Sequence, residues 1–151
     1  MHCDIVTQER TVFSGDVKTV NLPGTEGRMG ILPNHSPLLT TLGYGEVMVR
    51  LEDGTEEYYA IGGGYAEVQP DKVVVLADSA EHAEEIDLER AERARERAEK
   101  FMAEGVPEDP ERYAQIRASL QRAQIRLDVA HRRRRKSALP TLGSARHEDE
   151  N

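Results

Sequence analysis

The chain has 151 residues and few aromatic side chains, with 5 Tyr, 2 Phe and no Trp, so its core must be aliphatic. No apolar run approaches the roughly 18 residues that a membrane-spanning helix needs, and the N-terminus lacks the basic and apolar segments of a secretory signal. The single Cys excludes an internal disulfide, and the 5 scattered His show no metal-ligand spacing.

The net charge of −8 is unevenly distributed along the chain. Residues 1–85 contain 5 Lys and Arg against 15 Asp and Glu, a net charge of −10, whereas residues 86–151 contain 15 against 13, a net charge of +2. This asymmetry predicts two modules with different partners. A nucleic-acid partner is not indicated, because the basic residues alternate with acidic ones and no aromatic stacking side chains accompany them.

From the N-terminus to Ala77 the sequence has the pattern of short β-strands separated by turns. Asp53-Gly54 and Pro70-Asp71 each lie between two such runs and indicate two hairpins. Many short strands at close spacing predict an antiparallel sandwich or barrel. The expected strands are residues 17–22, 47–51, 56–61, 65–69 and 72–77.

Residues 29–42 form the most distinctive stretch of the chain, an apolar segment interrupted by Pro33 and Pro37. The two prolines exclude a regular helix and a central strand. Because the segment is too apolar for an ordinary surface loop, we expect a buried crossover. The later run of glycines at 62–64 lacks the Lys-Ser/Thr pair of a phosphate-binding loop, so it predicts tight packing between strands.

From Ile86 the spacing of apolar residues changes to that of helices. Asp87 is the expected N-cap of a helix over residues 88–104, and residues 105–110 break the pattern. A second helix begins at about Glu111, and two helices joined by a short turn predict an antiparallel hairpin. The expected organisation is β + α: an antiparallel β-sandwich at 1–85, a two-helix antiparallel hairpin at 86–136 and a disordered tail at 137–151.

The predicted contact between the helices is thin. It consists of Ala91, Ala94, Ala98 and Phe101 on the first helix and Tyr113, Ile116, Leu120, Ala123, Leu127 and Ala130 on the second. Because alanines bury little area, such a hairpin should be marginally stable alone and able to exchange one docking site for another.

Three separated segments, residues 20–27, 29–42 and 61–68, match in order and spacing the N-terminal domain of the epsilon subunit of F-type ATP synthases. The chain resembles this family over roughly residues 3–130. The resemblance implies a flattened β-sandwich in a non-catalytic rotor subunit that couples the gamma subunit to the c-ring, with the alpha and beta subunits as further partners. It also implies a peripheral location at the cytoplasmic face of the bacterial cell membrane, reached only through the complex. The alternative, from another functional class, is a free-standing nucleotide-sensing or adaptor module with no rotary partner.

The resemblance also implies an interface near the rotor ring and the gamma subunit. It includes Ile31, Pro33 and His35, and no motif places a catalytic partner beside His35. Arg28 stands where many members of the family carry an acidic residue that faces the polar loop of the ring. This departure leaves two alternatives: the ring loop carries a compensating acid, or this position does not contact the loop.

Residues 86–91, Ile-Asp-Leu-Glu-Arg-Ala, resemble the signature by which some bacterial epsilon subunits bind ATP. If the helices turn near residue 107 or 108, Arg90, Arg97 and Arg126 fall on one flank, where gathered guanidinium groups repel one another and favour an anion. The alternative interpretation is a helix start with an Asp–Arg pair at i,i+3. The resemblance implies a regulatory ATP, with no metal, bound by Arg90, Arg97, Arg122, Arg126, Ile86 and Ala91, with Glu81 and Asp87 on its adenine or ribose side.

A basic run, Arg132, Arg133, Arg134, Arg135 and Lys136, ends the second helix. One interpretation is a solvated helix end that interacts favourably with the helix dipole. The other is a contact with an acidic partner surface, because in the resembled family the extended C-terminal helices reach an acidic region of the beta subunits. Both interpretations stay open at the level of sequence. By the resemblance, the hairpin permits ATP hydrolysis when compact and ATP-bound, and inhibits it when extended.

Overall fold

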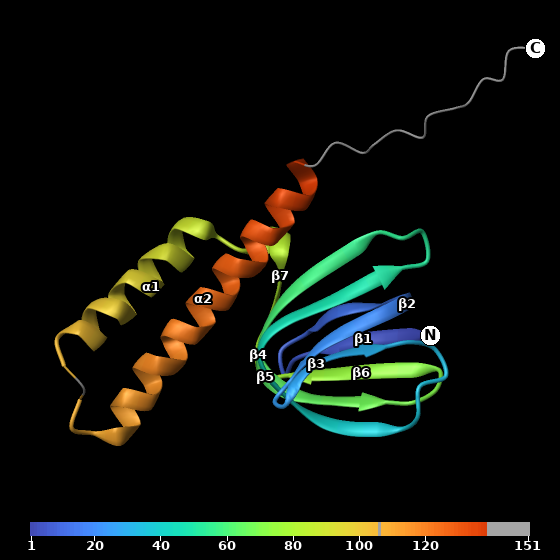
Figure 1. Ribbon diagram of the computed structural model, residues 1–151, viewed down its shortest axis with the longest axis horizontal. Helices are drawn as coiled ribbons and strands as arrows, with labels where there is room; N and C mark the ends of the chain where they lie inside the picture. Colours follow the sequence, from blue (N-terminus) through green and yellow to red (C-terminus); the bar gives the residue numbers. More distant parts are fainter. Residues whose placement is uncertain (106, 139–151) are drawn as a thin grey trace, which may run out of the picture.

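The computed structural model of the chain describes residues 1–105 and 107–138. A β-sandwich comes first, and two long helices stand beside it, with α2 between α1 and the sandwich (Figure 1). The predicted sandwich and helical hairpin are thereby confirmed. The strands are β1 (His2–Val6), β2 (Thr11–Gly24), β3 (Gly27–Ile31), β4 (Leu38–Leu51), β5 (Glu56–Val68), β6 (Lys72–Ala77) and β7 (Ala80–His82); the helices are the 3-10 helix η1 (Ala83–Glu85), α1 (Leu88–Ala103) and α2 (Pro110–Ala138).

The strands form one sheet that closes on itself. Their order is β1-β6-β5-β4-β2-β3, β1 also pairs with β2, and β7 pairs with β5. All pairs are antiparallel except β1–β6, so the expectation of an antiparallel sheet is wrong at this pair. The parallel pair arises where the sheet closes. The antiparallel hairpin with β2 fixes the direction of β1, and in this direction β1 runs parallel to β6.

Strand β5 is longer than predicted because it continues through the three glycines at 62–64. Residues before them pair with β7, and residues from Gly64 onward pair with β6, so the glycines mark a change of partner strand. Gly64 has a φ of +136°, and a Cβ at this position would lie 2.1 Å from the carbonyl oxygen of Leu76. The predicted tight packing at the glycines is therefore confirmed. Both predicted hairpin turns are present, at 51–55 and 69–72.

The prediction of a buried crossover at residues 29–42 is wrong. Residues 29–31 belong to β3 and residues 38–42 to β4, and the intervening 32–37 form a surface loop. Leu32 is 59% exposed, and the backbone N–H of Asn34 donates to the carbonyl oxygen of Pro70. The apolar character of the loop therefore does not serve the core. Ile31, in contrast, is fully buried, so its side chain is not available at the surface as an interface residue.

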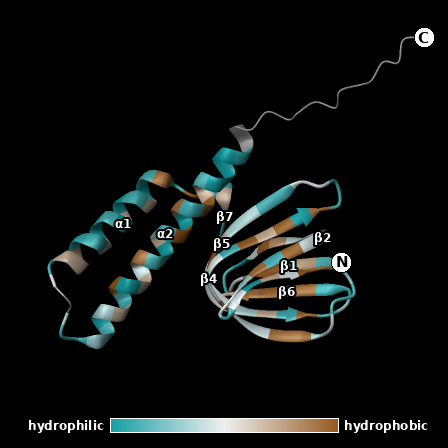
Figure 2. Cartoon of the chain, viewed as in Figure 1, coloured by the Kyte–Doolittle hydropathy of each residue, from teal (hydrophilic) through white to brown (hydrophobic). Residues whose placement is uncertain are grey.

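The core of the sandwich is aliphatic, as the composition predicts. Alternate residues of the strands point inward, and the strands carry most of the hydrophobic side chains while the helices are largely hydrophilic (Figure 2). Cys3 is buried here, and this burial, with the nearby charge of Asp4, raises the pKa of its thiol to about 12. The largest fully buried side chains of this core are Ile5, Val17, Val20, Leu22, Ile31, Val47, Val49, Tyr59, Ile61, Val68 and Val73.

The helical hairpin forms as predicted. Asp87 caps α1, because its side chain accepts the backbone N–H of Arg90 at 3.1 Å. The contact between the helices buries mainly small residues, and Phe101, at the end of α1, is 46% exposed. α2 continues to Ala138, and residues 139–151 of the predicted tail lie outside the described residues. Neither described helix is long and apolar enough to span a membrane. The buried contact residues are Ala91, Ala98, Ala123, Leu127 and Ala130.

Candidate functional site at the junction of the sandwich and α2

α2 docks on the outward face of β4 and β5 through a small apolar cluster. Val129 is its most buried member and Ile125 lies beside it, both on α2. This cluster contains far fewer side chains than the core of the sandwich. The facing residues are Met48, Tyr58, Ala60, Ala83 and Ile86.

The basic run at the end of α2 is bound to carboxylates of the sandwich. Arg132 lies 2.7 Å from Glu46, and Arg133 lies 2.5 Å from Glu84. Lys136 donates to Glu56 and to the hydroxyl of Tyr58. In this arrangement, the interpretation of the run as a merely solvated helix end is wrong for Arg132, Arg133 and Lys136. Arg134 and Arg135 are exposed.

Glu46 is the most buried of these carboxylates. Its side chain is 7% exposed, and its Oε1 atom lies 2.7 Å from Arg132 and 3.6 Å from Arg28. Its Oε2 atom is buried and accepts no hydrogen bond from the described residues. Arg28 is thus directed toward the face on which α2 docks.

Glu56 lies at the centre of a second charged group. It accepts hydrogen bonds from Lys136, Tyr58 and Arg50. In that order of importance, these donors lower the pKa of Glu56 to about 2. The pKa of Lys136 is raised, chiefly by the same Glu56. The pair therefore stays charged over the whole physiological range of pH.

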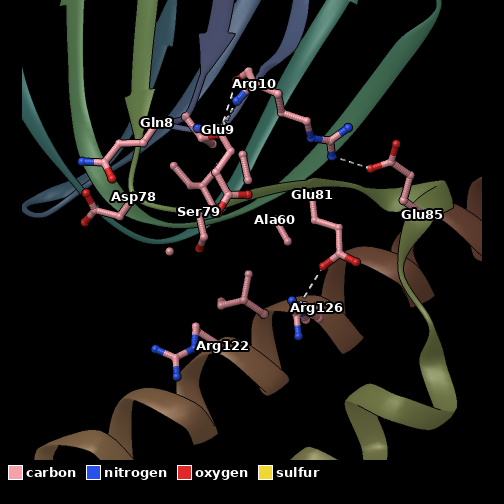
Figure 3. A pocket seen from close by; sticks show the side chains of 15 residues that line it. Gln8, Glu9, Arg10, Ala60, Asp78, Ser79, Glu81, Glu85, Arg122 and Arg126 are labelled. Atoms are coloured by element: carbon pink, nitrogen blue, oxygen red, sulfur yellow. Dashed lines mark hydrogen bonds and ion pairs between the residues drawn. The ribbon is translucent and has the colours of Figure 1, made fainter.

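An open pocket of about 520 Å³ lies on the same junction, beside the apolar cluster. Its walls are the turn between β1 and β2, the segment between β6 and β7, and α2 (Figure 3). Both signs of charge face this space. The charged residues that line it are Glu9, Arg10, Asp78, Glu81, Glu85, Arg122 and Arg126.

The two arginines of α2 are held differently in the pocket. The Nε atom of Arg126 lies 2.8 Å from the Oε2 atom of Glu81, yet this oxygen is buried without an aligned hydrogen bond from the described residues. The contact is therefore an ion pair, and Glu81 keeps an acceptor for another donor. Arg122 donates only to the hydroxyl of Ser119, at 3.2 Å, so its charge is not neutralised by a carboxylate among the described residues.

Of the eight predicted nucleotide-binding residues, the structure brings three together in this pocket: Glu81, Arg122 and Arg126. Ile86 lines a different surface hollow, with Leu88 and Ala130. Ala91 is buried against α2. The remaining three, Asp87, Arg90 and Arg97, lie on the exposed surface at α1.

The predicted gathering of Arg90, Arg97 and Arg126 is not present. Neither arginine of α1 lines the pocket, and the carboxylate of Asp87 caps the helix backbone rather than forming a pair with the guanidinium of Arg90. Glu81 supplies a counter-charge to Arg126, whereas Arg122 has no carboxylate partner among the described residues.

Sequence reasoning missed the other charged residues of the pocket, which include one ion pair between distant residues. Arg10, in the turn between β1 and β2, lies 2.9 Å from Glu85, which is 75 residues away in the chain. The pKa of Glu85 is lowered chiefly by this hydrogen bond. No spacing rule links residues so distant in sequence, so no signal in the sequence alone would have found the pair.

A family model described as "ATP synthase, Delta/Epsilon chain, beta-sandwich domain" matches residues 1–83, and the "long alpha-helix domain" of the same chains matches residues 84–131. The chain belongs to the ATP synthase delta/epsilon family. The boundary between the two matches falls at η1, where the sandwich gives way to the hairpin.

Individual relatives agree with this assignment. The ATP synthase epsilon chain of Dehalococcoides mccartyi is 54% identical over 134 residues, which cover 87% of this chain and 93% of the relative. That of Herpetosiphon aurantiacus is 48% identical over 131 residues, covering 87% and 94%. The chain is an epsilon subunit of this family, and the resemblance inferred from the sequence is confirmed.

Two solved structures share the fold. A chain of the mitochondrial ATP synthase of Euglena gracilis, solved as OSCP, F1 and c-ring in rotational state 1, gives a TM-score of 0.73 at 27% identity, covering 85% of this chain and 79% of that one. A chain from the central stalk and c-ring of the Tetrahymena thermophila mitochondrial enzyme gives 0.56 at 11% identity, covering 85% and 95%. The second likeness concerns the fold alone.

Proposed function

We propose that the chain is a non-catalytic subunit of the central rotor of an F-type ATP synthase, coupling the gamma subunit to the c-ring beneath the alpha and beta subunits. Membership of the epsilon family and the likeness to a chain of an F1 and c-ring assembly support this role. The proposal places the subunit at the cytoplasmic face of a bacterial membrane, attached only through the complex.

The surface of the sandwich away from α2 suits such a role. Leu39, Tyr65 and Leu76 are 72%, 54% and 51% exposed, and Tyr65 and Leu76 are direct cross-strand neighbours. Exposed large apolar side chains gathered on neighbouring strands are typical of a protein interface. The exposed loop at 32–37, with Pro33 and His35, supports a second contact, for which we propose the ring.

The hairpin is proposed to be a regulatory arm. The observation that carries this proposal is the docking contact itself: a small apolar cluster surrounded by ion pairs, of the kind expected for a contact that opens and closes. Docked on the sandwich, the arm leaves hydrolysis free. Released and extended, it inhibits hydrolysis.

ATP is the proposed regulatory ligand, and the pocket at the junction is its proposed site. Arg122 and Arg126 provide guanidinium donors for phosphate oxygens, and Glu81 provides an acceptor for a ribose hydroxyl or an adenine amino group. A ligand that binds only the docked form stabilises it by RT ln(1 + [L]/Kd), about 2.7 kcal/mol at a hundredfold excess over Kd.

Purification of the native complex tests the rotor role. We expect the large ATPase subunits, the gamma subunit and the c-ring to accompany the chain. Recovery of the chain without them would favour a free-standing nucleotide-sensing or adaptor module. Calorimetry on the isolated chain tests the ligand separately, and no heat of binding at millimolar ATP would refute the nucleotide site while leaving the rotor role intact.

A further inference from the structure

The docking contact between α2 and the sandwich is segregated by charge. In the ion pairs that join described residues of α2 to the sandwich and η1, the acidic partners come from the sandwich and η1 and the basic partners from α2. The pairs are Glu46–Arg132, Glu56–Lys136, Glu81–Arg126 and Glu84–Arg133. Three of these four cations belong to the basic run. The sandwich thus presents to the basic run an acidic strip, consisting of Glu46, Glu56 and Glu84.

We propose that this acidic strip is a built-in competitor for the basic run, which binds Arg132, Arg133 and Lys136 in place of an acidic surface on a partner protein. The proposal rests on the proposed function in one respect, since it requires that α2 leaves the sandwich. It goes beyond that function by naming the groups that hold the arm and the chemistry of the surface that displaces them.

The geometry makes the two uses of the basic run mutually exclusive. Glu46 is almost fully buried under α2, so Arg132 reaches it at 2.7 Å only while the helix is docked. In that position the guanidinium of Arg132 is occupied by an internal carboxylate. The ammonium group of Lys136 is likewise held between Glu56 and Tyr58. A partner carboxylate therefore gains these cations only as the sandwich loses them.

Arg134 and Arg135 give the partner its first contact. Both are exposed on the last turns of α2, and among the described residues neither pairs with an acidic group of the chain. Exposed cations attract an acidic surface before any internal pair has broken. Displacement can then proceed from the exposed cations to the paired ones, without a stage at which all pairs are lost together.

Poly-L-glutamate serves as the acidic probe, and its affinity for the isolated full-length chain is the measured quantity. Glu46→Gln and Glu84→Gln each remove one competitor, and Glu84 lies on the exposed η1, where the change leaves the core untouched. Glu52→Gln is the matched control, because Glu52 is exposed, lies outside the contact and changes the net charge equally. We expect the two strip variants to bind the probe roughly two- to tenfold more tightly than the wild type, with the control unchanged.

A second measurement follows the docking itself. Spin labels at Thr55→Cys and Gln121→Cys, both exposed, report the distance between the sandwich and α2, and the buried Cys3 stays unlabelled. Poly-L-glutamate should replace the distance set by the docked form with a different and broader distribution, at lower concentration in the strip variants. Equal affinity in Glu46→Gln, Glu84→Gln and Glu52→Gln would overturn the competition, as would binding of the probe without any change of the docked distance. Either result leaves the rotor role untouched, because co-purification tests that role.

Discussion

Arg126 approaches Glu81 through its Nε atom, at 2.8 Å, and this contact joins the middle of α2 to the strand β7. The same guanidinium lines the open pocket at the junction. One arginine therefore takes part both in docking the arm and in the proposed nucleotide site. If the proposed site is correct, we expect occupation of the pocket and the position of the arm to be coupled through this residue.

From the residues that line the pocket, we predict which arginines are needed for ATP binding. Charge-assisted hydrogen bonds contribute roughly 1.5–3 kcal/mol each, so Arg122→Ala should weaken ATP binding by about one to two orders of magnitude. Arg97→Ala is the matched control, because Arg97 is exposed on α1 and does not line the pocket. Calorimetry on the isolated chain measures both. Equal loss in the two variants would show that the nucleotide lies along α1, as the wider set inferred from the family implies.

Acid should release the arm. The lowered pKa of Glu56, about 2, is due first to Lys136, whose contribution disappears when α2 leaves the sandwich. A depressed carboxyl pKa stabilises the state in which it occurs at pH values above the ordinary pKa, and this stabilisation is lost as the pH falls toward the depressed value. The docked fraction, followed by the spin labels, should therefore fall between about pH 4.5 and pH 2. Glu56→Gln should flatten this part of the profile, and an unchanged profile in that variant would assign the transition to other carboxylates.

At Gly64, where β5 changes its partner strand, we expect a single added methyl group to lower the stability of the fold strongly. Gly64→Ala places a Cβ against the carbonyl oxygen of Leu76 at a positive φ, and we expect a loss of roughly 2–4 kcal/mol in the free energy of unfolding. Gly43→Ala is the control, since nothing lies within 4 Å of a Cβ there and the φ is ordinary. Urea denaturation measures both variants. Equal stability of the two would mean that position 64 tolerates a side chain.

Local patterns predicted part of the secondary structure, whereas the strands β1, β3 and β7 were not expected. The alternation in β2 and β6, the turn at Asp53-Gly54 and the N-cap at Asp87 are each decided by neighbouring residues, and each is present in the structure. The spacing of apolar residues on α2 likewise identified its contact with α1. These features depend on steric and hydrogen-bonding rules that act over a few residues.

Features that depend on distant residues were not predictable in the same way. The loop at 32–37 was expected to be buried because of its composition, although composition does not distinguish a core from an exposed apolar surface. The role of the basic run depended on Glu46, which lies 86 residues before Arg132. Arg126, expected beside Arg90 and Arg97, lies instead 2.8 Å from Glu81, a partner that no helical spacing reveals.

The arm itself gives the most direct prediction for the complex. α2 has 29 residues and so spans about 43 Å, far enough to carry the basic run well away from the sandwich when the arm is extended. A chain that ends at Glu85 keeps β7, which pairs with β5, and should retain its fold and its place in the complex. We expect the complex with this truncated chain to hydrolyse ATP faster than the intact complex, while coupled synthesis is largely retained. Equal hydrolysis rates at low and high ATP would show that the arm does not inhibit.

Substitutions on the two sides of the docking contact should have opposite effects on hydrolysis by the complex. Replacing the five cations at 132–136 with Gln removes the groups that hold an acidic partner, so hydrolysis should rise, and this rise should shrink at high ionic strength because salt screens exposed charges. Glu46→Gln removes only the internal competitor, which favours the extended arm, so hydrolysis should fall. Steady-state hydrolysis rates of the assembled complexes, with Glu52→Gln as the control, measure both. A change of the same sign in both variants would contradict competition between the acidic strip and the partner for one set of cations.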